Sequence, residues 1–417
     1  MHLPKRRPRP HNPMPESPYE VLTLFTAAMV GASLFIMATG ALMTFFKSAL
    51  SLDQAQLGLI LSTELVGSVA MTSVAGLLTD RFGDRAVVLW SGVLMGVALL
   101  AAALVQNFTW LLAWLFVYGI GYAAVTPAGC HAIIFFFQKS TRGLAMGVRQ
   151  CGVPIAGVLG SLLLPAIAAR FEYRGALVAA GALTLGACWI ASSLYREPTE
   201  LQGERVSIGT MLLEMLEIAR ESRLILLTLT SMILAAGQFA LVGYLALTFS
   251  HAAAYSVALS VGLFTISQVA AIGGRLAWGW ISDRVFRGSR TLPLAVVCLV
   301  VALLSLAMAG VGPHTAFFTA VLISAALGFT AEGWIGVSVI GFAEIGGEEH
   351  SGSALGVGLT WTLLAAMLTP AIFGAVVQAY GFGAAWRWLA LIEVLGVVPA
   401  LLAGSFVVGI FRRERLS

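Results

Sequence analysis

The stretch Gly76-Leu-Leu-Thr-Asp80-Arg81-Phe-Gly83-Asp-Arg85 is a short charged turn between two apolar segments. Each segment has about 20 residues or more, enough for a helix to cross the roughly 30 Å hydrocarbon core of a bilayer. The turn returns as Gly279-Trp-Ile-Ser-Asp283-Arg284, where the glycine, the aspartate and the arginine each stand 203 positions later. An internal repeat of this length predicts a membrane chain built from two related halves.

The composition also indicates a membrane protein. Hydrophobic residues make up 59% of the 417 residues and charged residues 11%, against about 25% charged in a soluble domain. The apolar runs do not alternate with polar residues, so they predict helices and not barrel strands. We expect an all-α membrane protein with twelve transmembrane helices in two pseudo-symmetric halves, near residues 21–45, 55–78, 86–106, 109–137, 143–169, 174–194, 223–249, 255–281, 292–311, 314–342, 351–379 and 385–411.

The longest polar interval separates six spans from six. Within it, the run from Met211 to Arg220 is amphipathic and predicts a helix lying on the membrane surface, with a partner-binding helix as the alternative. The predicted organisation is therefore a disordered basic arm at 1–20, a six-helix bundle at 21–194, a linker at 195–222, a second six-helix bundle at 223–411 and a tail at 412–417.

Basic residues predict the orientation in the membrane. Most of the 24 lysines and arginines fall in the arm, the tail and the loops on the same side as both termini. Because cytoplasmic segments carry an excess of Lys and Arg, we expect a multi-pass inner-membrane protein with both termini in the cytoplasm. The loop from Glu344 to His350 is an exception, since it holds three acids and no Lys or Arg.

Several classes of function are excluded by what the sequence lacks. The four cysteines stand singly in apolar segments, without a CxxC pair or a neighbouring histidine pair, so neither disulfides nor a metal site is expected. There is no HExxH and no G-x-S-x-G motif, and we expect neither an enzyme nor a cofactor. The net charge of +4 comes from residues at segment ends, so nucleic-acid binding is not expected either.

Twelve spans in two sixes, a central cytoplasmic loop and the motif Gly76-x-x-x-Asp80-Arg81-x-Gly83-x-Arg85 resemble the major facilitator superfamily of secondary transporters, although Asp84 stands where that family usually has Lys or Arg. The resemblance implies a cytoplasmic latch that holds the two halves together in the outward-open state. We expect Asp80 to lie against the N-terminal end of a neighbouring helix and Arg81 to pair with an acid. A loop that only fixes topology is the alternative. The latch residues would be Gly76, Asp80, Arg81, Gly83, Arg85, Gly279, Asp283 and Arg284.

Two arginines inside spans are candidate substrate contacts, since a charge at the centre of a membrane helix costs about 2.5–3.5 kcal/mol. Arg275 precedes Asp283 by eight residues, about 12 Å along a helix. Its surroundings resemble the eighth helix of oxalate/formate antiporters and monocarboxylate transporters, in which the corresponding arginine binds the substrate anion. A structural pair with an acid on a facing helix is the alternative. Arg149 is either a second anion contact or a side chain that reaches back to the interface.

Two acids inside spans are candidate proton carriers, because burial in apolar surroundings favours the protonated form of a carboxyl group. Glu332 lies in the middle of the tenth span and either pairs with Arg275 or binds a proton, or does both. Glu64 lies about 24 Å from the cytoplasmic turn and is either a coupling residue or a partly wet residue at the outer cavity mouth. Further cavity-lining candidates are Gln268, Gln238 and Trp334.

Together these features predict a secondary active transporter that moves a small organic anion, a carboxylate, by alternating access and with proton coupling. Efflux of drugs or metabolites is the alternative. The resemblance to proton/drug antiporters is weakened because the fourth-helix arginine of that group, expected near Leu115, is absent. The expected partners are an anionic solute, protons and the lipid bilayer, and we expect the protein to act as a monomer.

Overall fold

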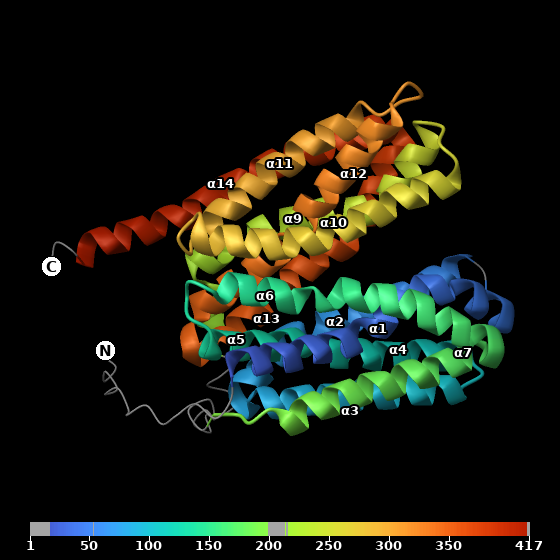
Figure 1. Cartoon of the computed structure of the whole chain (residues 1–417), viewed down its shortest axis with the longest axis horizontal. Helices are drawn as coiled ribbons and strands as arrows, with labels where there is room; N and C mark the ends of the chain where they lie inside the picture. Colours follow the sequence, from blue (N-terminus) through green and yellow to red (C-terminus); the bar gives the residue numbers. More distant parts are fainter. Residues whose placement is uncertain (1–16, 53, 199–212, 214–215, 415–417) are drawn as a thin grey trace.

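The computed structural model describes residues 17–52, 54–198, 213 and 216–414, and these are almost wholly helical. The predicted all-α fold with twelve spans in two halves is confirmed (Figure 1). The first half contains α1 (Pro18–Leu50), α2 (Gln54–Phe82), α3 (Asp84–Leu104), α4 (Phe108–Tyr122), α5 (Val125–Phe136), α6 (Arg142–Gln150) and α7 (Gly152–Leu194). The second contains α9 (Ser222–His251), α10 (Val257–Arg284), α11 (Thr291–Ala309), α12 (Phe317–Ala331), α13 (Ile335–Tyr380) and α14 (Phe382–Glu414).

Two long helices each contribute to two spans. The backbone of α7 leaves helical geometry at Phe171 and Glu172, which separate the fifth span from the sixth. The backbone of α13 does the same at Gly347 and His350, between the tenth span and the eleventh. The chain therefore reverses at these points without a long loop.

Parts of the predicted organisation fall outside the described residues. These are 1–16 of the basic arm, 199–212 and 214–215 of the linker with most of its predicted surface helix, and 415–417 of the tail. Where the arm is described, Ser17 precedes the first turn of α1, and its backbone N–H donates to Glu20 Oε2 at 3.3 Å. The helix thus begins at Pro18, three residues before the predicted first span.

Three spans that the sequence predicted as continuous helices are interrupted near their middles. The fourth breaks at Ala123 and Ala124 between α4 and α5, and the fifth breaks at Cys151 between α6 and α7. The tenth breaks between α12 and α13. Proline cannot donate a backbone hydrogen bond, and Pro127 and Pro154 each follow a break within the next helix turn. Interrupted membrane helices expose backbone groups inside the protein, where a solute or a side chain can use them.

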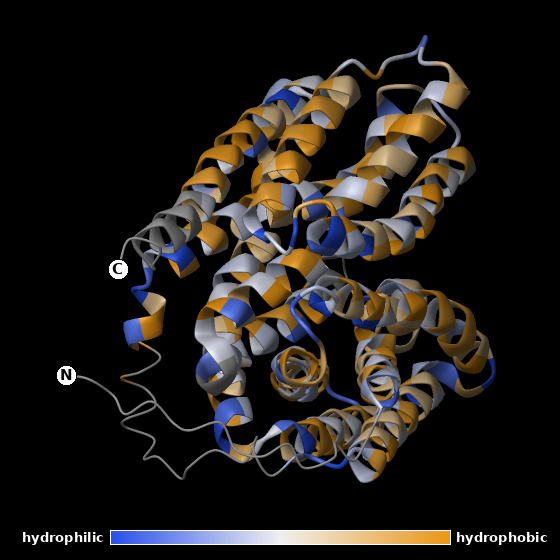
Figure 2. Cartoon of the chain, turned by 60° about the vertical axis from the view of Figure 1, so that its left-hand side comes forward, coloured by the Kyte–Doolittle hydropathy of each residue, from blue (hydrophilic) through white to orange (hydrophobic). Residues whose placement is uncertain are grey.

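The apolar surface divides into a packed interior and a lipid-facing belt. Small and medium side chains such as Ala28, Ala98 and Leu241 are fully buried between helices. Large apolar side chains point outward, for example Trp90 at 68% and Phe318 at 70% exposed. Hydrophobic residues are frequent along the helices of both halves (Figure 2). This is the distribution expected of a protein whose solvent is lipid.

The two halves meet mainly at one end of the bundle. α2 and α5 of the first half contact α13 of the second, and α6 contacts α10 and α13. The described side-chain bonds between halves include those of Ser73 and Asp80 on α2 and those of Arg275 and Asp283 on α10. We call this end of the molecule the latch end. From it the halves diverge toward the opposite side (Figure 1).

Candidate functional site

The aspartate of the first charged turn binds the other half of the protein. Asp80 Oδ1 accepts the backbone N–H of Gly352 at 2.8 Å, and Oδ2 accepts the backbone N–H and the hydroxyl of Ser353 at 2.8 and 2.6 Å. Gly352 and Ser353 lie at the start of the eleventh span, two and three residues after the non-helical His350. A carboxylate at a helix N-terminus satisfies free N–H groups and interacts favourably with the helix dipole.

The second charged turn repeats this arrangement in the opposite direction. Asp283 on α10 accepts the backbone N–H groups of Gly143 at 3.2 Å and Leu144 at 2.9 Å, at the N-terminus of α6. Arg290 joins it, donating to Asp283 at 2.6 Å and to Glu344 at 2.9 Å. Glu344 belongs to the acidic loop that was the exception to the excess of Lys and Arg on this side. Its basic partner is Arg290.

Glycines allow the two halves to approach at both contacts. A Cβ atom at Gly76 would meet the backbone of Gly352, and one at Gly279 would meet the backbone of Gly143. The backbones can therefore touch only because neither partner carries a side chain. Four glycines, two from each half, set the spacing of the latch end.

We expect Gly76→Leu to prevent this end from closing, because its side chain would occupy the space of the Gly352 backbone. The measurement is disulfide formation between cysteines placed at Ser73 and Thr360, whose hydroxyls lie 2.7 Å apart across the halves. The disulfide yield should fall by at least about tenfold, the effect of roughly 1.4 kcal/mol. Gly186→Leu is the control, since nothing lies within 4 Å of its Cβ position. An unchanged yield in Gly76→Leu would refute the contact.

The other residues of the first turn bind within their own half. Arg81 lies 5.2 Å from the ring centre of Phe82, and the expected pairing with an acid is not seen among the described residues. Arg85 Nε donates to the carbonyl of Ser192 at 3.0 Å. In the second turn Arg284 is exposed, and Arg290 contacts the aspartate instead. The acids of the two turns thus bond to the opposite half, whereas among the arginines of these turns only Arg290 does so, donating to the Lys139 carbonyl at 3.2 Å in the part of the chain that the structure describes.

A buried cluster surrounds Asp84, the residue at which the turn departs from the family pattern. Asp84 is fully buried and lies 2.8 Å from His131 Nδ1 on α5, and Tyr195 donates its hydroxyl to Asp84 at 3.4 Å. The backbone N–H of Asp84 donates to Glu197 Oε1 at 2.5 Å. Glu197 lies against Gly83, whose φ of 80° favours glycine. The start of the linker, at Tyr195 and Glu197, is therefore hydrogen-bonded to the charged turn at Asp84.

Burial, and after it the nearby Asp84 carboxylate, raises the pKa of Glu197. A carboxyl whose pKa is higher in the folded state than in the unfolded state stabilises the fold below its unfolded pKa of about 4.3, and this stabilisation is lost as the pH rises through the folded value. We therefore compare the melting temperatures of the wild type and Glu197→Gln between pH 8 and about pH 4.3. The melting temperature of the wild type should rise relative to that of the variant as the pH is lowered. A constant difference between the two proteins across this range would contradict the assignment.

Arg275 lies at the contact between the halves, well inside the bundle. Its Nη1 donates to the backbone carbonyl of Gln150 on α6 at 2.7 Å, and its Nε donates to the carbonyl of Glu332 at 3.4 Å. The Glu332 carboxylate lies 3.9 Å from Nη2 and accepts a hydrogen bond from Gln268 at 2.5 Å. The structure thus brings together three of the predicted site residues, at the break between α12 and α13.

Arg149 lies on the first-half side of the same contact. Its Nη2 donates to the Val125 carbonyl at 2.6 Å and its Nη1 to Gln150 Oε1 at 3.3 Å. The side chain is 0% exposed, so it does not reach back to the interface. The sulfur atoms of Met29 and Met146 each lie 3.9 Å from its nitrogens. Gln150 therefore contacts both deep arginines, one through its carbonyl and one through its side chain.

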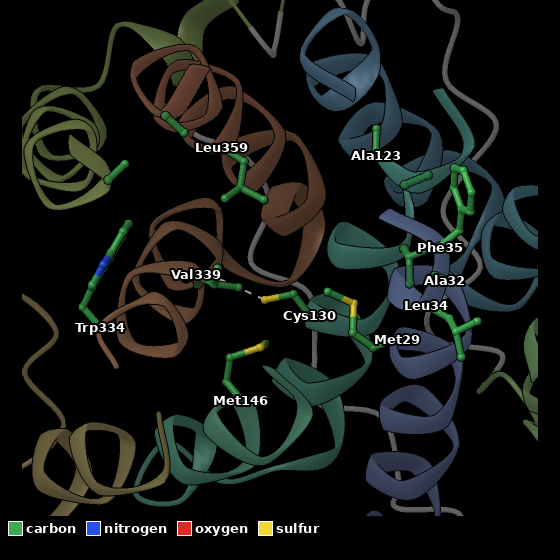
Figure 3. Close-up of a cluster of buried hydrophobic side chains, with 14 of the residues drawn as sticks. Met29, Ala32, Leu34, Phe35, Ala123, Cys130, Met146, Trp334, Val339 and Leu359 are labelled. Atoms are coloured by element: carbon green, nitrogen blue, oxygen red, sulfur yellow. Dashed lines mark hydrogen bonds between the residues drawn. The ribbon is translucent and has the colours of Figure 1, made fainter. Parts of the chain in front are cut away.

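Beside Arg149, the two halves meet through apolar side chains, and we call this part of their contact the apolar seam. Figure 3 shows Met29, Cys130 and Met146 of the first half facing Val339 of α13. The Cys130 thiol points at the Val339 carbonyl, with a sulfur–oxygen distance of 3.8 Å. Among the described residues no carboxylate lies within 4.0 Å of Arg149, whereas Arg275 has Glu332. If all three groups are ionised, the site carries one excess positive charge.

The remaining candidates lie outside this cluster. Glu64 on α2 is fully buried inside the first half, where the hydroxyl of Thr39 donates to it at 3.1 Å, so it is not a wet residue at a cavity mouth in this conformation. Trp334 is 1% exposed and donates its indole N–H to the Ala331 carbonyl at 2.9 Å, which leaves no N–H for a solute. Gln238 is half-buried on α9, and none of the described hydrogen bonds joins it to Arg275 or Glu332.

Sequence reasoning missed two residues that the structure places at these contacts, Gln150 and Arg290. It also missed the partners of the charged turns, although a signal for them existed. The segment Arg142-Gly143-x-Ala145-x-Gly147 recurs as Ser351-Gly352-x-Ala354-x-Gly356. These two segments are the helix starts that receive Asp283 and Asp80. A repeat that carries both a charged turn and its acceptor indicates reciprocal contacts between halves.

Comparison with known proteins gives a consistent family. The model of the Major Facilitator Superfamily matches residues 23–344. An uncharacterised MFS-type transporter of Mycobacterium tuberculosis is 27% identical over 95% of this chain and 87% of its own length. The agnestins efflux protein of Paecilomyces divaricatus is 24% identical over 91% and 85%. The 3-(3-hydroxy-phenyl)propionate transporter of Escherichia coli is 30% identical over 34% and 35%.

Solved structures show the same fold. The transporter FucP in an outward conformation superposes with a TM-score of 0.73 at 18% identity, covering 92% of this chain and 98% of FucP. The human organic anion transporter MFSD10 gives 0.73 at 16% identity, covering 92% and 100%. At these identities the likeness establishes the architecture alone.

Proposed function

Because this chain belongs to the Major Facilitator Superfamily, a family of transporters and not of enzymes, we propose that it moves a small organic carboxylate by alternating access, coupled to protons. One observation carries the substrate class: among the described residues, the two deep arginines at the contact between halves have a single carboxylate partner, Glu332. A solute carboxylate supplies the missing negative charge, and a guanidinium binds it through a matched pair of N–H donors.

The names of relatives support this class. The 3-(3-hydroxy-phenyl)propionate transporter is a carrier of an aromatic carboxylate, although the match covers only 34% of this chain. A carboxylate with an apolar body also suits the surroundings of Arg149, where the methionine sulfurs and the apolar seam offer no further charge. The proposed contacts are Arg275, Arg149 and Gln268, with Gln238 and Trp334 as peripheral members.

Glu332 is the proposed proton carrier. It is 3% exposed and shares its surroundings with Arg275 and Gln268. If Glu332 takes up a proton, Arg275 loses its carboxylate partner and can bind a solute anion instead, so proton and solute enter the site together. Glu64 is the second candidate, since its Oε2 is buried without a hydrogen-bond partner in the described structure.

We assign the latch end to the cytoplasm, because the basic residues of the loops there follow the pattern of cytoplasmic segments. Both termini of a monomer in the inner membrane would then be cytoplasmic, and the latched conformation is closed toward the cytoplasm. The acidic groups of the latch, Asp80 and Asp283, must leave their helix N-termini when the halves rock to the opposite state.

Efflux of a metabolite is the second candidate. The agnestins efflux protein matches 91% of this chain, far more than the propionate transporter does. Import and export can use the same site, since the direction depends on the gradients. A host strain with and without the gene, grown on a panel of toxic compounds, would separate them: export predicts resistance, and import of a toxic solute predicts sensitivity.

The test is a proteoliposome screen of labelled monocarboxylates, dicarboxylates and aromatic acids, with and without an imposed pH gradient. We expect uptake of at least one carboxylate, and greater accumulation when the outside is acidic. Uptake limited to neutral or cationic solutes would exclude the proposed substrate class.

A further inference from the structure

The break between α6 and α7 leaves one carbonyl group without its usual partner. In a helix, the carbonyl of residue 150 accepts the backbone N–H of residue 154. Here residue 154 is a proline, which has no N–H. The helix begins again at Gly152, and the Gln150 carbonyl must find a donor elsewhere, because an unpaired buried carbonyl is unfavourable. The donor is Arg275 Nη1, at 2.7 Å.

We propose that Pro154 is a positioning residue that makes the Gln150 carbonyl into a clasp for Arg275, and that this clasp holds the two halves in the latched conformation. The bond joins α6 of the first half to α10 of the second. Two further contacts keep these helices together at the same level: Gly147 packs on the Arg275 backbone, and the Cys151 thiol lies 3.8 Å from the Ile272 carbonyl.

The clasp also couples solute binding at Arg275 to the contact between the two halves. Arg275 is 4% exposed, with one N–H directed to Gln150 and another to the Glu332 carbonyl. A solute carboxylate that takes the Nη1 donor displaces the Gln150 carbonyl, so the halves lose a bond when the solute binds. This second step rests on the proposed function, whereas the role of Pro154 does not depend on any substrate.

Pro154→Ala tests the clasp, because it restores an N–H at the position that the Gln150 carbonyl would use within the helix. Pro154 is only half-buried, so alanine can be accommodated. Pro165→Ala is the matched control, as it removes a proline from the same helix, and the N–H that it restores would pair by position with the carbonyl of Ser161 and not with that of Gln150. The readout is the disulfide yield between cysteines at Ser73 and Thr360 across the halves, measured in liposomes without any solute.

We expect Pro154→Ala to lower the disulfide yield several-fold, because the new N–H competes with Arg275 Nη1 for the Gln150 carbonyl and weakens that charge-assisted hydrogen bond, and we expect Pro165→Ala to leave the yield unchanged. An unchanged yield in Pro154→Ala would overturn the proposal, and so would an equal fall in both variants. If Pro154→Ala does not accumulate, Pro154→Gly provides the same N–H and carries the same expectation. The two proposals can fail separately. If no carboxylate is taken up in the screen but the disulfide yield still falls in Pro154→Ala and not in Pro165→Ala, the proposed substrate is wrong and the clasp remains supported.

Discussion

Replacement of Arg275 by alanine is expected to reduce carboxylate uptake at least about 100-fold in proteoliposomes. Two charge-assisted hydrogen bonds to a solute contribute roughly 1.5–3 kcal/mol each, and their loss leaves Glu332 as an unpaired acid beside the site. Arg275→Lys keeps the charge but loses the forked geometry, so an intermediate loss is expected. The measurement is the initial rate of labelled uptake at matched protein density.

Arg287→Ala is the control for this prediction, because Arg287 is exposed in the turn after α10 and contacts neither Gln150 nor Glu332. Its uptake should equal that of the wild type. If Arg275→Ala transported every carboxylate at the wild-type rate, Arg275 would be a purely structural residue, the alternative that its sequence context left open.

Glu332→Gln is expected to separate solute movement from the proton gradient. Glutamine preserves the size of the side chain and can still bond to Gln268, but it cannot bind and release a proton at Arg275. Accumulation driven by an imposed pH gradient should fall about tenfold or more, while exchange of labelled for unlabelled solute continues. A tenfold fall corresponds to roughly 1.4 kcal/mol of lost driving force.

Glu393→Gln is the matched control, since Glu393 is a fully buried acid on α14, away from the contact between halves. It should retain gradient-driven accumulation if it is folded. If Glu332→Gln kept its full response to the pH gradient, Glu332 would not be the coupling residue. The same assay on Glu64→Gln would then show whether that acid carries the proton.

The fold could be predicted from sequence because its determinants are local and repeated. Twelve apolar runs predicted the twelve spans. The recurrence of Gly76-x-x-x-Asp80 as Gly279-x-x-x-Asp283 predicted the two halves. Composition and run length determine which segments cross a membrane, whatever their neighbours. The three interruptions inside the fourth, fifth and tenth spans were not predicted in this way.

The candidate site was predictable only in part, because its key contacts depend on how the halves meet. Arg275 and Glu332 stood out as rare charges at membrane depth, and the structure places them 3.9 Å apart. Gln150 did not stand out, since its role comes from a carbonyl that Pro154 leaves free and from a partner 125 residues away. The burial of Glu64 inside one half likewise depends on packing against Thr39 that no local pattern shows.

The second latch aspartate illustrates the same limit. The motif arginine next to Asp283 is Arg284, but Arg290, six residues further along the turn, makes the bonds to Asp283 and Glu344. Between its arginine and its glycine the second turn has two residues more than the first, and this longer turn, with a positive φ at Arg287 and Gly288, brings Arg290 to the aspartate. A motif match predicts which residue types are present, whereas the path of the loop determines which arginine contacts the aspartate.

The most direct test of the central claim, that a guanidinium at the contact between halves binds a carboxylate, is a calorimetric comparison of one ligand in two forms. The carboxylate with the highest uptake and its neutral amide are titrated into purified wild type and Arg275→Ala. We predict that the wild type binds the carboxylate at least about tenfold more tightly than the amide, a difference of roughly 1.4 kcal/mol, and that Arg275→Ala loses this preference. Equal affinities of the wild type for the two forms, or an undiminished preference in Arg275→Ala, would contradict it.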